Sequence, residues 1–165
     1  MSYCCECGCK LELKELKNEG MIPFCKSCNA YRFEKYNVAV SMVVVNSSID
    51  KALLIKQYGM NRYILVAGYV NKGESAEEAC RRELAEEVGL EAQKLIFQKS
   101  KYYAKSNTLM LNYIVIVKNE NVRTNEEIDD YSWFDIEEGK QKIAGGSLAE
   151  EFYLQFYQRV ENHEI

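Results

Sequence analysis

Histidine is almost absent from this chain. Its one histidine, His163, lies beside the C-terminus, where chain ends commonly fray. Catalysis by imidazole, and zinc sites built on histidine, both need such side chains inside a folded domain. The sequence therefore disfavours both kinds of site and directs attention to carboxylates and thiolates.

Long apolar runs are also lacking. No stretch approaches the ~18 residues that span a bilayer, and the first five residues, MSYCC, do not have the basic and then apolar layout of a secretion signal. We therefore expect a cytoplasmic protein without membrane contact.

Internal repeats and low-complexity linkers are missing too. The formal net charge of −4 disfavours nonspecific attraction to nucleic acid or anionic lipid.

What is present suits one domain with an appendage, because the chain has 165 residues of which 47% are hydrophobic. Seven cysteines without a secretion signal favour reduced thiols and metal ligands over disulfides. Four of these cysteines form two short knuckles with metal-ligand spacing, Cys4-x-x-Cys7 and Cys25-x-x-Cys28. Thiolates paired in this way predict a closed tetrahedral zinc site.

The segment between the knuckles has the pattern of a hairpin. Residues 10–14 alternate in period two, and residues 18–20, Asn-Glu-Gly, offer a turn. These features predict a zinc ribbon over residues 1–36, and the competing interpretation is a tail with free thiols. Cys5 and Cys9 lie close enough to the knuckles to compete as ligands.

The rest of the chain mixes strands and helices. Four segments have strand patterns: Val38–Val45, Ala52–Gln57, Tyr63–Val70 and Tyr113–Lys118. A closing helix is predicted from Ser147, with Glu150 as its capping partner. We expect Cys80 to be a packing residue of the core.

Carboxylates and arginines crowd the segment GYVNKGESAEEACRRELAEEVGL, residues 68–90. Ser75 followed by Glu78 is a capping box, and Gly89 supplies a left-handed stop. The segment from Ser75 to Val88 is therefore predicted to be a helix. Glu, Lys and Arg are strong helix formers, so the ordinary interpretation is an exposed helix laced with ion pairs.

Helical periodicity argues against that interpretation for part of the charge. A rotation of ~100° per residue places Glu83 and Glu87 within about 40° of each other, inside the apolar sector. The other members of that sector are Ala76, Ala79, Cys80 and Leu84. Two carboxylates turned toward an interior repel each other and lose hydration unless a cation lies between them. A Mg²⁺ or Mn²⁺ site is the simplest explanation, because these ions prefer oxygen ligands.

The same segment resembles the Nudix box at every position. The matching residues, with the box spacing between them, are Gly68, Glu74, Arg82-Glu83-Leu84, Glu86-Glu87 and Gly89-Leu90. Because all the spaced positions are filled, the match is far more specific than a lone glycine motif. The resemblance implies an α/β/α sandwich with a mixed sheet, in a Nudix hydrolase domain over residues 37–165.

The resemblance also implies roles for individual side chains. Glu83, Glu86 and Glu87 would act as metal ligands or as activators of water. Arg82 would pair with Glu74 and hold the loop that presents the carboxylates. Glu127, which precedes Trp133 and Phe134 by a few residues, would be a further ligand.

A zinc ribbon followed by this box is similar to the NADH pyrophosphatase branch of the family. The resemblance implies metal-dependent hydrolysis of the pyrophosphate bond in a nucleoside diphosphate that is linked to another moiety. The substrate it implies is a dinucleotide such as NADH. It also implies a homodimer. Residues 100–110, SKYYAKSNTLM, depart from the SQPWPFPxS-like stretch of that branch. Tyr102 and Tyr103 are the candidates there for stacking on a base or a nicotinamide.

Three alternatives stay open at this point. The enzyme would act on ADP-ribose or a nucleotide sugar, or would remove a nucleotide cap such as NAD from RNA, although the acidic net charge weakens the RNA option. A protein of another class would sense a nucleotide through its zinc ribbon and an inactive Nudix domain. The intact pairs Arg82-Glu83 and Glu86-Glu87 favour catalysis over sensing.

Overall fold

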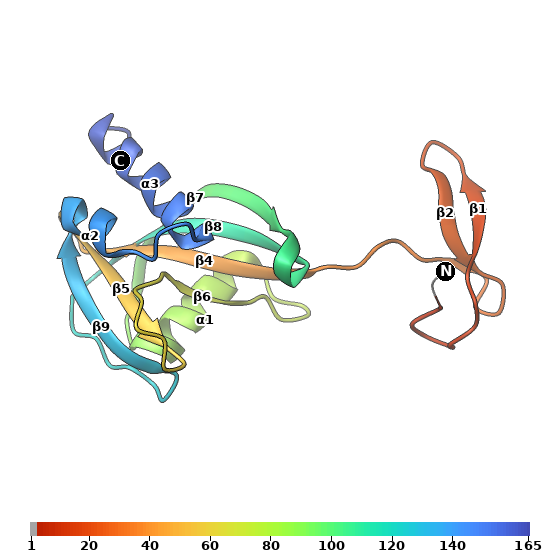
Figure 1. Ribbon diagram of the computed structural model, residues 1–165, viewed down its shortest axis with the longest axis horizontal. Coiled ribbons are helices and arrows are strands. Elements are labelled where there is room, and N and C mark those ends of the chain that lie inside the picture. The colour runs from red at the N-terminus through yellow and green to blue at the C-terminus, as the bar shows by residue number, and fades with distance from the viewer. Residues whose placement is uncertain (1–2) are drawn as a thin grey trace. The chain divides into compact units, whose positions relative to one another are not determined.

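The computed structural model describes residues 3–165, and the internal contacts of the chain divide it into two units, Met1–Tyr36 and Asn37–Ile165 (Figure 1). Each unit has its own sheet. No helix among the described residues has the length and apolarity that crossing a membrane requires.

The N-terminal unit is a small antiparallel sheet. Its strands follow one another in the order of the sequence: β1 (Glu12–Leu16), β2 (Gly20–Cys25) and β3 (Ala30–Tyr31). The turn between β1 and β2 uses positive φ angles at Asn18 (71°) and Gly20 (82°), which these two residue types adopt at least cost. The hairpin predicted between the cysteine knuckles is therefore present.

The larger unit contains a six-stranded sheet. Its strands are β4 (Asn37–Val45), β5 (Lys51–Gln57), β6 (Val66–Tyr69), β7 (Ala92–Tyr103), β8 (Thr108–Val117) and β9 (Ile128–Asp135). The order is β7-β8-β4-β5-β9, and β6 also pairs with β4. Strands β4 and β8 run parallel, whereas the other pairs are antiparallel, so the prediction of a mixed sheet is confirmed.

Strand prediction succeeded where both faces of a strand are buried. The segments expected at Val38–Val45 and Ala52–Gln57 coincide with β4 and β5 to within one residue at their starts. The strand expected at Tyr63–Val70 is shorter, because Tyr63 and Ile64 form isolated bridges outside β6. Strands β7 and β9 were not predicted, because polar residues on their exposed positions hide the pattern.

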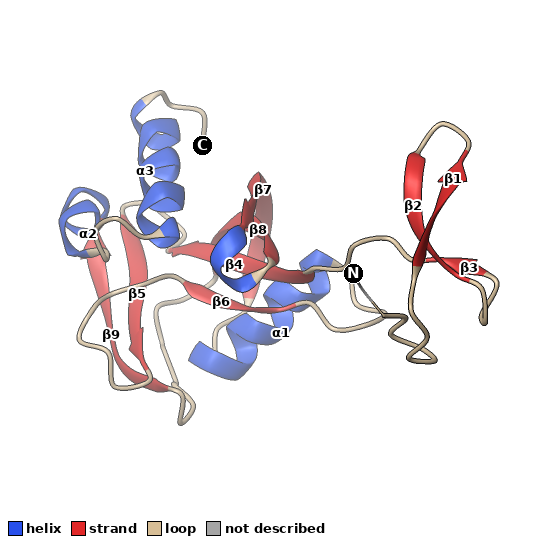
Figure 2. Ribbon diagram, turned by 45° about the vertical axis from the view of Figure 1, so that its right-hand side comes forward, coloured by secondary structure: helices blue, strands red, loops and turns tan. Residues whose placement is uncertain are grey.

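Helices cover both faces of this sheet, as Figures 1 and 2 show. One face carries α1 (Ala76–Val88), and the other carries α2 (Ile136–Lys142) and α3 (Leu148–Glu161). The α/β/α sandwich is therefore confirmed. Helix α3 begins after its predicted cap, since the side chain of Ser147 accepts a hydrogen bond from the backbone of Glu150.

Strand β4 separates two apolar cores. Val40, Met42 and Val44 face the core that α1 completes, while Val43 and Val45 face the core under α3, because successive side chains of a strand point to opposite faces. Helix α1 contributes Cys80, Leu84 and Val88 to the first core, and α3 contributes Phe152, Tyr153 and Phe156 to the second. The expectation that Cys80 packs in the core is confirmed, and the rotation of α1 on the sheet is set by this packing.

Candidate active site

Both ends of α1 are held as the sequence predicted. Ser75 Oγ accepts a hydrogen bond from the backbone nitrogen of Glu78 at 3.2 Å, and Glu78 Oε2 accepts one from the backbone nitrogen of Ser75 at 2.8 Å. Gly89 ends the helix with φ of 65°, in the left-handed region that favours glycine. Because the ends and the buried face are fixed, the directions of the glutamates on α1 follow.

Glu83, Glu86 and Glu87 line a cleft of about 560 Å³ in the larger unit. Residues of β4, β6, β8 and the turn after β5 form its other walls, and Glu127 also lines it. The volume lies within the range of roughly 300–1,000 Å³ typical of small-molecule sites. The structure therefore brings four carboxylates to one cleft.

Glu87 is the most buried of these carboxylates, with 5% of its surface exposed. Burial, together with the nearby charges of Glu83 and Glu127, raises the pKa of Glu87 to about 8. Among the described residues, no hydrogen-bond partner reaches its buried Oε2 atom. A buried oxygen without a partner, beside further carboxylates, suits a divalent cation with hard oxygen ligands.

The absence of a side chain at Gly68 on β6 leaves room for the carboxylate of Glu83. A Cβ atom added at Gly68 would lie 1.9 Å from Cδ and 2.1 Å from Oε1 of Glu83. Such distances are far shorter than any contact between non-bonded atoms. The glycine at this position is therefore a steric requirement of the glutamate on the neighbouring helix.

Arg82 ties the carboxylates to the loop before α1. Its guanidinium binds Glu74 through two parallel contacts, Nε to Oε1 at 2.8 Å and Nη2 to Oε2 at 2.9 Å. It also donates to Glu83 Oε1 at 2.6 Å and to the carbonyl oxygen of Tyr69 at 2.9 Å. The Arg82 guanidinium, helped by the backbone N–H of Asn71, lowers the pKa of Glu74 to about 2. A planar guanidinium with several donors is suited to such a junction.

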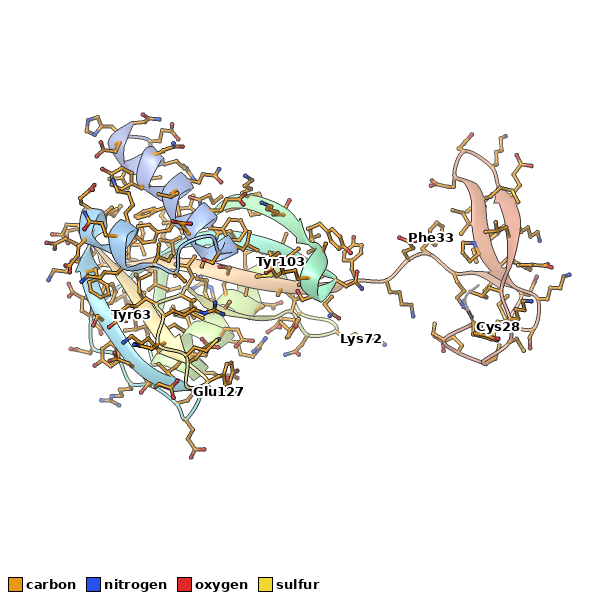
Figure 3. The ribbon with its side chains drawn as sticks, in the orientation of Figure 1. Cys28, Phe33, Tyr63, Lys72, Tyr103 and Glu127 are labelled. Carbon is orange, nitrogen blue, oxygen red and sulfur yellow. The ribbon has the colours of Figure 1, made fainter. Side chains whose placement is uncertain are left out.

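Glu127 lies in the segment just before β9 (Figure 3). Its Oε2 atom accepts a hydrogen bond from the hydroxyl of Tyr58 at 2.9 Å, and its backbone nitrogen donates to Asn125 Oδ1 at 3.0 Å. Glu127 and Tyr58 both line the cleft, although 69 positions separate them in the sequence.

The tyrosines that the sequence singled out lie elsewhere. Neither Tyr102 nor Tyr103 is among the residues that line the cleft. The hydroxyl of Tyr102 donates to Asn107 Oδ1 at 2.7 Å. Tyr58 and Tyr69 line the cleft instead, with 65% and 56% of their surfaces exposed. Tyr69 follows Gly68 directly, which is a signal in the sequence, whereas only the fold identifies Tyr58.

Residues 100–110, whose sequence departs from that of the NADH pyrophosphatase branch, do reach the cleft. Residues 100–110 form the end of β7, a short 3₁₀ turn (η1, Ala104–Ser106) and the start of β8. Ser106, Thr108 and Met110 from this stretch line the cleft. Any substrate held there contacts a wall whose sequence differs from that of the resembled branch.

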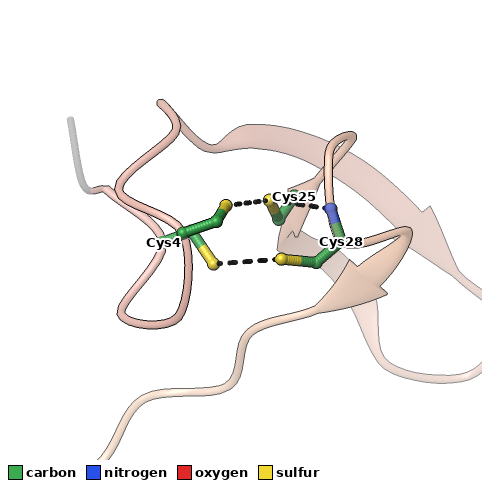
Figure 4. Close-up of side chains that lie close together, drawn as sticks. Cys4, Cys25 and Cys28 are labelled. Atoms are coloured by element: carbon green, nitrogen blue, oxygen red, sulfur yellow. Dashed lines mark hydrogen bonds between the residues drawn. The ribbon is translucent and has the colours of Figure 1, made fainter.

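The N-terminal unit brings four thiols together, those of Cys4, Cys7, Cys25 and Cys28, with all sulfur atoms within 4.8 Å of one another (Figure 4). The sulfurs of Cys4 and Cys28 lie 3.9 Å apart, and those of Cys7 and Cys25 lie 3.4 Å apart. A tetrahedral zinc site with bonds of about 2.3 Å requires sulfur separations of about 3.8 Å. These cysteines could therefore hold one zinc ion.

The competing cysteines are not part of this group. Cys5 and Cys9 are exposed, and Cys5 Sγ lies 3.1 Å from the ammonium of Lys35. The Arg32 Nε atom donates to Cys4 Sγ at 3.2 Å, and this cation lowers the pKa of the Cys4 thiol to about 6. The register that sequence spacing favoured for the four ligands is the one that clusters here.

Comparison with known proteins agrees with this arrangement. The family model described as NUDIX domain matches residues 35–156. Nudix hydrolase 19, chloroplastic, of Arabidopsis thaliana is 30% identical over 150 residues, which cover 86% of this chain and 34% of the relative. The NAD-capped RNA hydrolase NudC of Pseudomonas aeruginosa is 28% identical over 138 residues, which cover 82% of this chain and 48% of the relative. The chain thus spans about half or less of the length of these curated relatives.

Solved structures share the fold. A NUDIX hydrolase from Nitrosomonas europaea superposes with a TM-score of 0.68 at 18% identity, covering 99% of this chain and 93% of that one. The NUDIX domain of Shewanella oneidensis NrtR, complexed with ADP ribose, superposes with a TM-score of 0.63 at 16% identity, covering 81% of this chain and 91% of that one. With the family model spanning most of the chain and the glutamates of the box gathered at one cleft, this protein belongs to the Nudix hydrolase family.

Proposed function

We propose that this protein hydrolyses the pyrophosphate bond of an NAD-type dinucleotide such as NADH, with Mg²⁺ or Mn²⁺ held by Glu83, Glu86, Glu87 and Glu127. The observation that carries the proposal is the buried, unpartnered oxygen of Glu87 beside three further carboxylates in one cleft. Uncompensated carboxylates in a partly buried site are costly unless a cation joins them.

The carboxylate oxygens of the cleft suit Mg²⁺ and Mn²⁺. All the candidate ligands are carboxylates, and Mg²⁺ and Mn²⁺ prefer hard oxygen ligands. When bound, the cation neutralises charge on the pyrophosphate and makes a water molecule more acidic. The net charge of −4 adds to the need for such neutralisation around a phosphate substrate.

Side chains of the protein position the carboxylates and accept the proton of the attacking water. Arg82 and Glu74 hold the loop and the helix in one geometry, and Gly68 leaves the space that the Glu83 carboxylate occupies. One carboxylate of the cleft accepts a proton from the attacking water, which must approach a phosphorus atom in line with the leaving group. In the metal-free chain Glu87 is largely protonated at neutral pH, because burial raises its pKa to about 8, and a bound cation would favour its ionised form.

The substrate class rests on three observations. The first is the combination of the box with a cysteine cluster suited to a structural zinc ion. The second is the pair of exposed tyrosines in the cleft, Tyr58 and Tyr69, which offer faces for stacking on a base. The third is the similarity to relatives named NAD-capped RNA hydrolase, which makes an NAD cap on RNA the second candidate substrate.

A substrate panel tests the proposal. NADH, ADP-ribose, a nucleotide sugar and an NAD-capped RNA are each incubated with Mg²⁺ and with Mn²⁺, and kcat/KM is measured. We expect NADH to give two mononucleotides and to be preferred over the nucleotide sugar. A preference for ADP-ribose would replace the proposal with an ADP-ribose pyrophosphatase, and nucleotide binding without turnover would replace it with a sensing module.

A matched pair of variants tests the site itself. Glu87→Gln should remove most turnover, while Glu91→Gln should leave it unchanged, because Glu91 is exposed and pairs with Lys118 outside the cleft. Equal turnover of the two variants would contradict the assignment of Glu87. The homodimer implied by the resemblance is measured in the same preparations by light scattering.

A further inference from the structure

The turn that follows β5 has an unusual backbone. Tyr58 and Gly59 both have positive φ angles, 55° and 68°, and the backbone nitrogen of Met60 donates to the carbonyl oxygen of Gln57 at 3.1 Å. These features describe a β-turn with positive φ at both central residues, as in type I′, whose first central position favours Asn, Asp or Gly. A tyrosine there is strained, and such strain persists where the surrounding structure enforces it.

An irregularity in the sheet precedes this turn. The register of β5 against β9 shifts between Lys56 and Gln57, directly before Tyr58. The unpaired residue is Asp129, since Lys56 pairs with Asp130 and Gln57 with Ile128, so the bulge lies on β9 and bends that strand. The bulge of β9 therefore lies opposite the end of β5 from which the turn begins.

Two hydrogen bonds show where the turn is directed. The backbone nitrogen of Gly59 donates to Asp129 Oδ2 at 2.7 Å, and the hydroxyl of Tyr58 donates to Glu127 Oε2 at 2.9 Å. Glu127 directly precedes β9, and Asp129 is the second residue of that strand. Tyr58 is 65% exposed, so burial contributes little to the position of its side chain and the hydroxyl contact contributes more.

Glu127 needs such support more than the other candidate ligands do. Glu83 and Glu87 are held by the backbone of α1, whereas Glu127 lies outside any helix or strand. The charges of Glu83 and Glu127 both disfavour the ionised form of Glu87, because like charges repel. A neutral hydroxyl that occupies Oε2 of Glu127 restrains this carboxylate and leaves Oε1 for a cation, without adding a charge of its own.

We propose that Tyr58 is a positioning residue whose hydroxyl holds the carboxylate of Glu127 ready for the divalent cation. This inference rests on the proposed function, because it takes Glu127 as a metal ligand. Partners that orient a ligand in this way typically change metal affinity or activity by about 10–100-fold when they are removed. The strained turn then has a role, since it brings the hydroxyl to a carboxylate 69 positions away.

Direct titration of the full chain with Mn²⁺ by calorimetry tests this proposal. Tyr58→Phe deletes only the hydroxyl, and we expect its apparent Kd for Mn²⁺ to rise about 10-fold, with a similar fall in kcat and little change in KM for NADH. Tyr131→Phe is the control, because it removes a hydroxyl from an exposed tyrosine of β9 outside the cleft. Gly59→Ala retains the hydroxyl but strains the turn, and it should also weaken Mn²⁺ binding.

A double variant separates positioning from other roles. If Tyr58 acts through Glu127, then Tyr58→Phe in a Glu127→Gln background should weaken Mn²⁺ binding no further. Additive losses would overturn the proposal. So would a raised KM of Tyr58→Phe with unchanged Mn²⁺ affinity, which would assign the hydroxyl of Tyr58 to substrate contact.

The same measurements separate the inference from the proposed function. Weaker Mn²⁺ binding by Tyr58→Phe, in a protein that hydrolyses none of the panel substrates, would support the positioning role and reject the proposed activity. Mn²⁺ affinity unchanged by Tyr58→Phe, in a protein that hydrolyses NADH, would reject the positioning role alone. A wild-type chain that binds no Mn²⁺ would overturn both.

Discussion

Replacing Gly68 by alanine adds one methyl group at the place where the structure has least room. The new Cβ atom would lie 1.9 Å from Glu83 Cδ and 2.4 Å from its Oε2 atom. Carbon atoms in contact are separated by about 3.5–4.0 Å. The carboxylate of Glu83 therefore has to move by roughly 1.5–2 Å, or β6 has to shift by a similar amount.

Either movement disturbs the candidate site. Displacement of Glu83 breaks its 2.6 Å contact with Arg82, which also holds Glu74. A misplacement of about 1 Å in an active site costs about 100-fold in rate, which corresponds to about 2.7 kcal/mol. We expect Gly68→Ala to lower kcat/KM for NADH by at least about 100-fold in the presence of Mg²⁺.

The assay compares three variants for activity and for melting temperature. Gly145→Ala is the matched control, since no atom lies within 4 Å of its added Cβ atom and its φ is not positive. Gly68→Ala combined with Glu83→Ala removes the clash, so it should recover melting temperature lost by Gly68→Ala while turnover stays low. Activity of Gly68→Ala within about threefold of wild type, with the fold intact, would refute this reasoning.

Four further results are expected. Glu87→Gln should lower turnover and, at pH 7, raise the melting temperature of the metal-free protein, because folding then no longer requires a carboxyl whose pKa rises from 4.5 to about 8 to take up a proton; a lower melting temperature would contradict this view of the site. Wild-type protein should contain one zinc ion per chain, and Cys25→Ser should lose it, as metal analysis by mass spectrometry would show. Because Arg82 lowers the pKa of Glu74 from 4.5 to about 2, the pair stabilises the fold above pH 4.5 and its contribution is lost as pH falls from 4.5 toward 2. The melting temperature of wild type should thus fall more steeply across that window than that of Glu74→Gln, and parallel curves would argue against the pair. Tyr103→Ala should change kcat/KM for NADH by less than about twofold, since its ring does not line the cleft, and a large loss would restore it as a substrate contact.

Helix α1 shows how much of this protein was predictable from local sequence. Its ends depend on Ser75, Glu78 and Gly89, all within a few residues of the backbone groups that they satisfy. The inward direction of Glu83 and Glu87 follows from 3.6 residues per turn, which the helix imposes whatever surrounds it. The cysteine knuckles are local in the same sense, so their ligand positions were predicted from spacing.

Local sequence did not predict the partly exposed strands or the residues that line the cleft. Strand β9 is exposed at three successive positions, so its pattern resembles a loop, and only pairing with β5 makes it a strand. Gly68 meets Glu83, and Tyr58 meets Glu127, because strand register and helix packing place distant segments side by side.

The sequence by itself determined the helix with its inward glutamates, the thiol cluster and the family, because each depends on short spacings that backbone geometry converts directly into direction. The tertiary structure alone decided that Tyr58 lines the cleft while Tyr102 and Tyr103 do not. The lining of a cleft depends on which strands pair and in which register, and long-range packing sets both.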